Sequence, residues 1–292
     1  MKLAFDLISD LHLDTWPAKF DWTYRATAPY CIVAGDVARD RALLLRTLRH
    51  LSQCYQAVFY IDGNEEHSMY WNRINHSYQR LAQKISQIEN IVYLQNNVVV
   101  INGVAILAAN GWWGFDFDSV QEPGTVIEWY KDRWQNAVQR DPAYPTAVSD
   151  KDISWIINAA VRDARYMVQS VRKLQISGDV NHIVVVTHTV PLPELIDHDL
   201  QLHGQPRFNT MGNAYMREVL DEDIEKKIHT WCFGHYHKSV DRELNGIRYV
   251  SNCRGRGDTE WSQSAYYPKK IIVEFYYLER CFFNIHKFFY IH

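Results

Sequence analysis

Five short polar motifs contain the residue types that bind metal ions and move protons. They are Asp10-Leu11-His12, Gly35-Asp36, Gly63-Asn64, Thr187-His188 and Gly234-His235-Tyr236-His237. Side chains at positions i and i+2 of an extended segment project to the same side, roughly 6.6 Å apart along the backbone. A carboxylate and an imidazole, or two imidazoles, can therefore converge on one cation. Histidine nitrogen and carboxylate oxygen are common ligands of transition metals.

Each motif also has an ordinary explanation. A polar residue at the end of a strand faces solvent, an aspartate after glycine belongs to a turn, and a histidine after the apolar run that ends at Thr187 can be a hydrogen-bonded core residue. However, all five motifs directly follow apolar runs of strand length, and all draw on Asp, Asn and His. This coincidence favours one shared metal site.

Apolar, β-rich runs alternate with stretches of helical periodicity, which predicts an α/β protein with helices covering its sheets. The predicted strands are Leu3–Ile8, Cys31–Ala34, Ala57–Ile61, Val98–Ile101, Val104–Ala108, His182–Thr187, Ile228–Phe233, Ile247–Val250 and Ile271–Tyr277. The predicted helices are Arg41–Gln53, Trp71–Glu89, Asp152–Leu174 and Met216–Lys226. The pair Asn102-Gly103 predicts a tight hairpin, so at least part of the sheet is expected to be antiparallel.

Residues 111–149 interrupt this alternation with many aromatic residues and several Gly and Pro. They are expected to form either an irregular covering loop or a cap that faces the substrate, because long loops inside compact domains are often functional. Ser149 with Asp152 forms a capping-box pattern and predicts that a helix begins near residue 150. We see no repeat or linker, so residues 1–292 are expected to form a single domain.

Composition excludes several classes of protein. With 31 Lys and Arg against 34 Asp and Glu, the 292-residue chain has a formal charge of −3 and no global basic field for gripping a nucleic-acid backbone. Hydrophobic residues make up 47%, enough for a packed core. No apolar run approaches the roughly 20 residues that span a bilayer. The five cysteines form no CxxC pair, which fits a reducing compartment. A soluble cytoplasmic protein without a membrane partner is expected.

The ordered set of motifs, from Asp10 to His237, resembles the calcineurin-like metallophosphoesterase superfamily. Two further segments support the resemblance. WWGFDF, beginning at Trp112, is similar to a Trp-Asp loop of some bacterial and phage-type members, and SNCRG, beginning at Ser251, is similar to a closing Asn-Pro-Arg-Gly segment with Cys253 in place of Pro. The resemblance implies a four-layer αββα sandwich of mixed sheets.

The resemblance also implies a pair of divalent transition-metal ions. One ion would be held by Asp10, His12, Asp36 and His237, and the other by Asp36, Asn64, His188 and His235, with Asp36 bridging. Only a carboxylate among these side chains offers two oxygens that can bridge ions about 3.5 to 4 Å apart. Mixed N and O ligands suit Mn, Fe, Zn or Co better than Ca or Mg, and the resemblance favours manganese.

The implied activity is hydrolysis of a phosphoester by a hydroxide held between the two ions. The expected substrate is a nucleotide or another small phosphorylated metabolite, either a diester or a monoester. A nuclease of the double-strand-break repair type is the alternative enzyme, for which nucleic acid would be the partner. A non-catalytic scaffold with weakened chemistry is the alternative from another class. The sequence predicts no oligomeric state.

The third position of the family's Gly-Asn-His-Glu or Gly-Asn-His-Asp motif is Glu65 in this chain. The histidine there usually assists departure of the leaving group, and a glutamate anion repels an incoming phosphate. His67, two residues later, is a candidate to recover that catalytic role, or else an ordinary loop histidine. The change favours a phosphodiester, whose leaving group needs less acid assistance.

Three further features have open interpretations. Trp112 and Trp113 could stack on a nucleobase or pack in the core. Arg254 could pair with a phosphate or stabilise a local turn. The aromatic tail, Cys281–His292, could be a final packed element or a contact with a second subunit.

Overall fold

The protein is described by a computed structural model, in which residues 2–17, 20–117, 120–140, 147–196, 199, 202, 204–257, 265–274 and 289–290 are placed well enough to describe. The strands are β1 (Lys2–Ile8), β2 (Tyr30–Ala34), β3 (Ala57–Ile61), β4 (Ile91–Tyr93), β5 (Asn97–Ile101), β6 (Val104–Ala109), β7 (His182–Thr187), β8 (Ile228–Phe233), β9 (Val240–Leu244), β10 (Ile247–Ser251), β11 (Lys269–Glu274) and β12 (Phe289–Tyr290). The α-helices are α1 (Arg41–Cys54), α2 (Ile74–Ile85), α3 (Pro123–Arg140), α4 (Asp150–Gln175) and α5 (Met216–Asp221).

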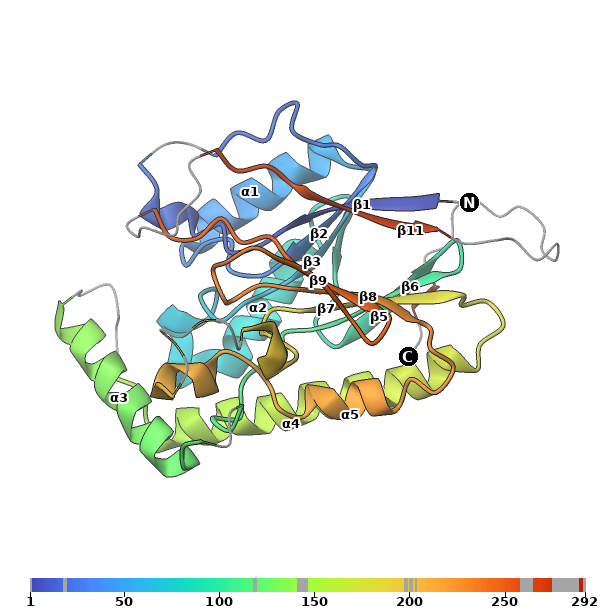
Figure 1. Cartoon of the computed structure of the whole chain (residues 1–292). Helices are drawn as coiled ribbons and strands as arrows, with labels where there is room; N and C mark the ends of the chain where they lie inside the picture. The colour runs from blue at the N-terminus through green and yellow to red at the C-terminus, as the bar shows by residue number, and fades with distance from the viewer. Residues whose placement is uncertain are drawn as a thin grey trace.

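The strands form two mixed sheets that face each other (Figure 1). The first has the order β11-β1-β2-β3-β4, and the second has the order β12-β5-β6-β7-β8-β10-β9. In the first sheet β1 to β4 are parallel, with β11 antiparallel at the edge. In the second sheet β6, β7, β8 and β10 are parallel. Parallel neighbours end at the same edge of a sheet, so the motifs that follow β1, β2 and β3 are gathered together, as are those that follow β7 and β8.

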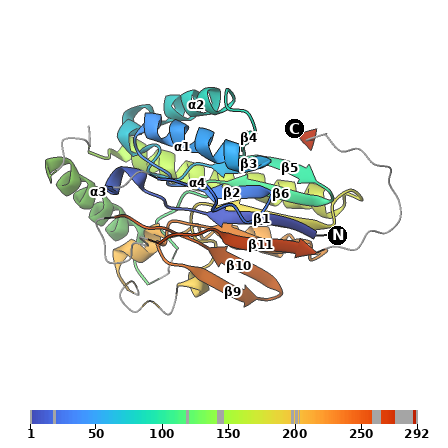
Figure 2. The ribbon, with the colours of Figure 1, turned by 90° about the horizontal axis from the view of Figure 1, so that it is seen from above.

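Helices cover both outer faces, which confirms the predicted four-layer sandwich. Figure 1 shows α1 on the outside of the first sheet and α4 with α5 on the outside of the second, and Figure 2 shows α2 beside α1. The layer between the sheets is apolar and includes Phe5, Ile32, Phe59, Ile106 and Val184. Strands buried on both faces are expected to be continuously apolar, which is why these runs are conspicuous in the sequence.

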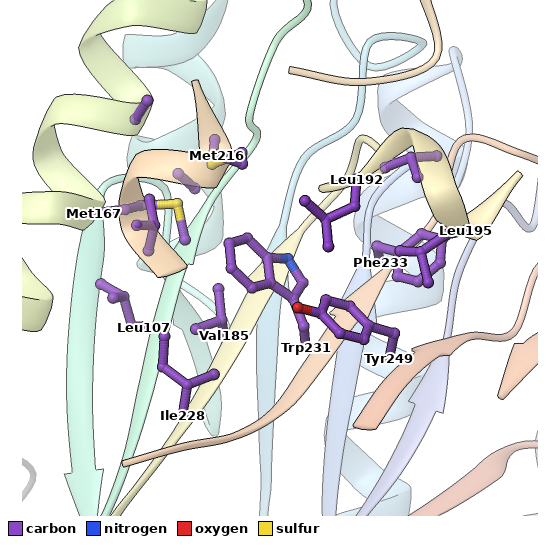
Figure 3. Close-up of a cluster of buried hydrophobic side chains, with 14 of the residues drawn as sticks. Leu107, Met167, Val185, Leu192, Leu195, Met216, Ile228, Trp231, Phe233 and Tyr249 are labelled. Carbon is purple, nitrogen blue, oxygen red and sulfur yellow. The ribbon is translucent and has the colours of Figure 1, made fainter. Parts of the chain in front are cut away.

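A second apolar cluster lies between the second sheet and α4 and α5 (Figure 3). Trp231 of β8 is fully buried there, next to Val185 and Tyr249. Its indole Nε1 donates a hydrogen bond to the Thr187 hydroxyl at 2.9 Å. Thr187 is the last residue of β7 and directly precedes His188, so this core contact anchors the strand end that carries a predicted metal ligand.

Most predicted elements are present, and the hairpin and the helix cap are confirmed. Asn102 and Gly103 have φ of 48° and 81° and join the antiparallel strands β5 and β6. The Ser149 hydroxyl accepts a bond from the Asp152 amide, and the Asp152 carboxylate accepts one from the Ser149 amide at 2.8 Å. The prediction missed β4 and β9, which are short or carry exposed polar residues.

The interpretation of residues 111–149 as an irregular loop was wrong for its central part, which forms α3. The amphipathic pattern of α3 was obscured by aromatic residues on both its buried and its partly exposed positions. In Figure 1, α3 stands at the end of the sandwich opposite the N-terminus, where β1 and the strands parallel to it end. The predicted tail element Cys281–His292 lies outside the described residues, except for the backbone of β12, which pairs with β5.

In the part of the chain that the structure describes, none of the helices has the length and apolarity that crossing a bilayer requires.

Candidate metal centre

The structure brings the predicted ligand side chains together at the strand ends. Their carboxylate and imidazole atoms form two groups, in each of which the ligand atoms lie within 4.8 Å of one another. The first group contains Asp10, His12, Asp36 and His237, and the second contains Asp36, His188 and His235. Asp36 belongs to both. This partition is the one that the family resemblance implies for two ions bridged by Asp36.

In the first group the two histidines and two aspartates point inward. The Nε2 atoms of His12 and His237 are 2.8 Å apart. Asp10 Oδ1 lies 3.4 Å from His237 Nε2, and Asp36 Oδ2 lies 3.7 Å from His12 Nε2. In this arrangement two nitrogens and two carboxylates enclose one small space.

The second group is arranged around the other side of Asp36. His188 Nε2 lies 3.4 Å from Asp36 Oδ2 and 3.2 Å from His235 Nδ1. The amide oxygen of Asn64, Oδ1, is 3.2 Å from the same His188 nitrogen. With Asn64, this side of Asp36 gathers two nitrogens and two oxygens, the set that the family resemblance implies for the second ion.

Backbone strain is concentrated in these motifs. Asp10, His12, Asp36, His235 and His237 have positive φ, between 43° and 65°. Non-glycine residues adopt this left-handed conformation at a cost on the order of 1 kcal/mol each. The surrounding sheet ends must therefore hold these residues in place, and such strain clusters at functional sites.

Hydrogen bonds determine which atom of each histidine faces inward. His188 Nδ1 is 2.9 Å from the Ala34 carbonyl, and His235 Nε2 is 3.0 Å from the Thr210 carbonyl. A carbonyl can only accept, so these two nitrogens donate, and the opposite nitrogens, His188 Nε2 and His235 Nδ1, face each other within the cluster. Trp113 also stacks on the His235 ring, with the centroids 5.3 Å apart.

The electrostatics of the cluster suit a cation. Burial lowers the pKa of His12, His235 and His237, so these imidazoles are held in the neutral form that binds metal. Burial also opposes charge on His188, but Asp36 outweighs it and raises the pKa of His188 to about 10. Despite its burial, Asp36 keeps its charge, because His188 and His12 lower the pKa of its carboxyl. The Asp36 carboxylate thus attracts positive charge to the centre of the cluster.

The donor set fits two transition-metal ions. Two atoms bound to one ion by bonds of about 2.0 to 2.2 Å lie within about 4.4 Å of each other. The ligand atoms of each group lie within 4.8 Å of one another, which is close to that limit. Four imidazole nitrogens with carboxylate and amide oxygens are typical ligands of Mn, Fe, Co and Zn. Asp10 and Asp36 cancel two of the four charges of a divalent pair, which leaves the centre able to attract a phosphate.

Glu65 lies beside this cluster and lines the same cavity as His12, Asp36 and Asn64. Its carboxylate is 3.6 Å from Arg39 Nε and 3.9 Å from Arg256 Nη1. Burial and the neighbouring Asp36 raise the pKa of Glu65 to about 7, against the opposing effect of Arg256 and Arg39. The Glu65 amide also donates to Asp36 Oδ1 at 2.8 Å, so this residue orients the shared carboxylate through its backbone.

His67 does not reach the cavity, contrary to the suggestion that it recovers the role of the missing motif histidine. It is fully buried, and its ring stacks on Tyr78 with the centroids 4.0 Å apart. Its Nε2 is 2.9 Å from Asp62 Oδ2, and its Nδ1 is 2.9 Å from Ser77 Oγ. The chain turns after Asn64, because the amides of His67 and Ser68 bond to the carbonyls of Asn64 and Glu65. The i, i+2 geometry of an extended segment therefore does not apply.

Replacing His67 by alanine should accordingly lower stability and leave the ligand set intact. The change removes the imidazole from the buried Asp62 carboxylate, which keeps its bonds from the Tyr93 hydroxyl and the Asn110 amide, and this costs about 2 kcal/mol. We expect this loss in the urea-induced unfolding free energy, with unchanged metal stoichiometry in the folded protein. His76, exposed on α2, is the matched control, and its alanine variant should stay within about 0.5 kcal/mol of the parent. A stable His67→Ala protein that binds metal but no longer hydrolyses substrate would give His67 a catalytic role instead.

Sequence reasoning missed Glu66, which joins two of the motifs. Its carboxylate accepts bonds from the amides of Asp36, Val37 and Gly63, at 3.2, 2.7 and 2.9 Å. Burial and Asp36 raise the pKa of Glu66 to about 8. Its position next to Glu65 was the available signal, but only the folded chain shows which amides it binds.

The cluster lies in a cavity of about 1070 Å³. One wall is formed by α3, through Trp129, Tyr130, Arg133, Trp134 and Ala137. The other wall is formed by the segment around the 3₁₀ turn Pro206–Thr210 and by the residues after β8. The α3 residues lie within 111–149, for which a cap facing the substrate was one of the two expectations, whereas the turn residues were not predicted as part of the site.

The side chains of Trp112, Trp113 and Arg254 are all buried. Trp112 is fully buried and donates to the Tyr78 hydroxyl at 2.8 Å, while Trp113 lines the cavity with its ring against His235. Arg254 is buried, with its guanidinium carbon 3.8 Å from the Trp16 ring centroid, and it is not among the residues that line the cavity.

Solved structures of other proteins resemble this chain. A crystal structure of a phosphopantetheinyl hydrolase from Mycobacterium tuberculosis aligns with a TM-score of 0.63 at 19% identity, covering 89% of this chain and 94% of that one. A dimetal phosphatase from Danio rerio aligns at 12% identity over 89% of both chains, but its TM-score of 0.43 carries no weight. In sequence, an uncharacterised protein of Acanthamoeba polyphaga mimivirus is 20% identical over 235 residues, 77% of this chain and 78% of that protein.

No family model matches the chain. A structural likeness at this level of identity shows a shared fold, and function must be argued from the site itself. The chain therefore has the calcineurin-like metallophosphoesterase fold that its motifs predict.

Proposed function

We propose that the protein is a metal-dependent phosphoesterase that acts on a nucleotide or another small phosphorylated metabolite. One observation carries this proposal, namely the two ligand groups that share Asp36 and contribute side chains to the lining of a cavity of about 1070 Å³. A cavity of this size suits a small-molecule substrate. The free thiols of Cys31, Cys54, Cys232 and Cys253 support the cytoplasm as its compartment.

The chain's own residues have three tasks in the proposed reaction. Asp10, His12, Asp36, Asn64, His188, His235 and His237 hold a pair of divalent ions, for which we propose manganese. When bound, such a pair makes hydroxide available near neutral pH and neutralises charge on the phosphoryl oxygens. Asp36 would contribute to the binding of both ions, and the amide of Glu65 orients its carboxylate. The aromatic residues of α3 narrow the cavity and exclude water.

The substrate we favour is a phosphodiester. Glu65 stands where a proton donor would assist a poor leaving group, and its carboxylate is held by Arg39 and Arg256. A diester with an acidic leaving group needs little such assistance. No covalent enzyme intermediate is needed, because the nucleophile is water.

The proposal is tested by metal analysis together with turnover. The purified protein loaded with manganese should contain two equivalents of metal and hydrolyse bis-p-nitrophenyl phosphate well above the metal-free blank. Metal binding without hydrolysis of any nucleotide or diester would favour the scaffold alternative. Turnover confined to oligonucleotides would favour the nuclease.

Replacing Glu65 by histidine should raise monoesterase activity on alkyl phosphates. For glycerol 3-phosphate, whose leaving group is poor, we expect a gain of about 10-fold, at the low end of what a positioned acid contributes. Hydrolysis of p-nitrophenyl phosphate should change much less, because its leaving group needs no proton.

Glu65→Gln is the matched variant, since it removes the negative charge without adding an acid. An equal gain in both variants would mean that charge repulsion, and not proton donation, limits the reaction. No gain in either would assign the leaving-group role to another residue.

A further inference from the structure

Two arginines line the cavity from elements that carry none of the predicted metal ligands. Arg133 belongs to α3, and Arg207 belongs to the 3₁₀ turn Pro206–Thr210, which packs against α3. Both line the cavity that contains Asp36 and Asn64. They are separated by 74 positions in the sequence (207 − 133), so only the fold brings them together.

These two guanidinium groups lack matched counter-charges. Within the described residues, neither makes a hydrogen bond or an ion pair through its side chain. The other cations of the cavity differ in this respect, since Lys238 lies 2.6 Å from Asp199 and Arg256 lies 3.9 Å from Glu65. Asp199 acts on Arg207 only at longer range, and its carboxylate already accepts bonds from Lys238 and the Tyr236 hydroxyl.

The pair is electrostatically unfavourable without an anion. Burial lowers the pKa of Arg207, and the positive charge of Arg133 lowers it further. An arginine stays charged under these conditions, so the repulsion remains. Trp129 lies under Arg133, with 5.5 Å between the guanidinium carbon and the ring centroid, and supports it over the cavity.

The surroundings also indicate where this pair lies relative to the metal ligands. The positive charge of Arg207 lowers the pKa of His237. Burial and the charge of Glu65 raise the pKa of Tyr130, and the charge of Arg133 lowers it. Arg207 is therefore within electrostatic range of the cluster, and Arg133 is within electrostatic range of Arg207 and Tyr130. Apolar side chains, among them Trp134, Leu202 and Met211, line the same cavity.

We propose that Arg133 and Arg207 form a second anion site, and that the substrate is a phosphoester carrying another phosphate group at its far end. This inference rests on the proposed phosphoesterase activity and specifies its substrate class. The planar fork of arginine binds phosphate oxygens in pairs. Two unmatched guanidinium groups complement the charge of a phosphate dianion, and the apolar wall accommodates the body of the molecule between its two ends.

A series of α,ω-alkane bisphosphonates, compared with alkyl monophosphonates of the same length, tests this proposal. Each compound competes with bis-p-nitrophenyl phosphate in the manganese-loaded protein. One phosphonate is expected at the metal ligands and the other at the arginines. At the chain length that spans both sites, the bisphosphonate should inhibit about 10- to 100-fold more strongly, the range typical of charge-assisted hydrogen bonds.

The variants Arg133→Gln and Arg207→Gln should each reduce this preference to within about 3-fold. Arg80→Gln, an exposed arginine of α2 that does not line the cavity, should retain it. Equal inhibition by both series at every length would overturn the proposal, as would a preference that survives Arg207→Gln. A failure of this proposal can be distinguished from a failure of the proposed function. If the protein does not hydrolyse the chromogenic diester, calorimetric binding of the same two series to the manganese-loaded protein gives the same comparison.

Discussion

Replacing Asp36 by alanine is expected to abolish hydrolysis of bis-p-nitrophenyl phosphate, with a loss on the order of 10³-fold or more. Among the residues that the structure describes, Asp36 alone belongs to both ligand groups. Its Oδ2 lies 3.7 Å from His12 Nε2 and 3.4 Å from His188 Nε2. Without it, the two groups lose both their shared oxygen and the charge that attracts a cation. Metal content after manganese loading should fall from two equivalents to one or fewer.

The companion variant Asp36→Asn keeps the shape of the side chain while removing its charge. It should fold with nearly the parent's stability and still lose metal, because an amide offers one weak ligand oxygen in place of two charged ones. Asp21→Ala, an exposed aspartate that does not line the cavity, is the control and should behave as the parent. An active Asp36→Asn protein with two bound metal ions would refute the bridging role.

Replacing Gly63 by alanine should produce the second large loss of activity, although Gly63 itself binds nothing in the cavity. A β-carbon there would lie 2.1 Å from Asp36 Oδ1 and 2.7 Å from the Asp36 amide nitrogen. A carbon atom cannot lie this close to either of these Asp36 atoms, so the Asp36 carboxylate or the loop after β3 must move. A displacement of about 1 Å at a reacting centre costs on the order of 100-fold. The change should appear as lower turnover together with weaker manganese binding.

Gly178→Ala is a matched control for this effect. The same methyl group added at Gly178 meets no atom within 4 Å, and we expect unchanged turnover and metal content. If Gly63→Ala retained full activity, the close approach of the loops after β2 and β3 would not be required for the reaction. A Gly63→Ala protein that fails to fold would be distinguished by its circular dichroism.

Much of the fold could be predicted because its strands are locally conspicuous. Runs such as Cys31–Ala34 and Ile183–Val186 are apolar throughout, since the sheets are buried on both faces. The hairpin at Asn102-Gly103 depends on two residues that tolerate positive φ, a property of the residues themselves. By contrast, α3 was missed because its aromatic residues serve both a core and a cavity wall, which blurs the helical period.

The ligand set was predictable for a related reason. Each motif directly follows a strand, and parallel neighbours deliver their carboxyl ends to the same edge of a sheet. The order of the motifs, together with their resemblance to a known family, then sufficed to select Asp10, His12, Asp36, Asn64, His188, His235 and His237. The structure brings all seven to one place.

The sequence by itself determined which side chains could bind metal, because residue types and the ends of strands can be recognised from the local sequence. Only the tertiary structure decided where His67 points, which amides Glu66 holds, and that Arg133 and Arg207 face one cavity. These facts depend on contacts between segments distant in the chain, such as the bond from Asn110 to the Asp62 carbonyl. The physical reason is that a side chain's partners are set by the packing of whole layers, and local propensity carries no information about which layers meet.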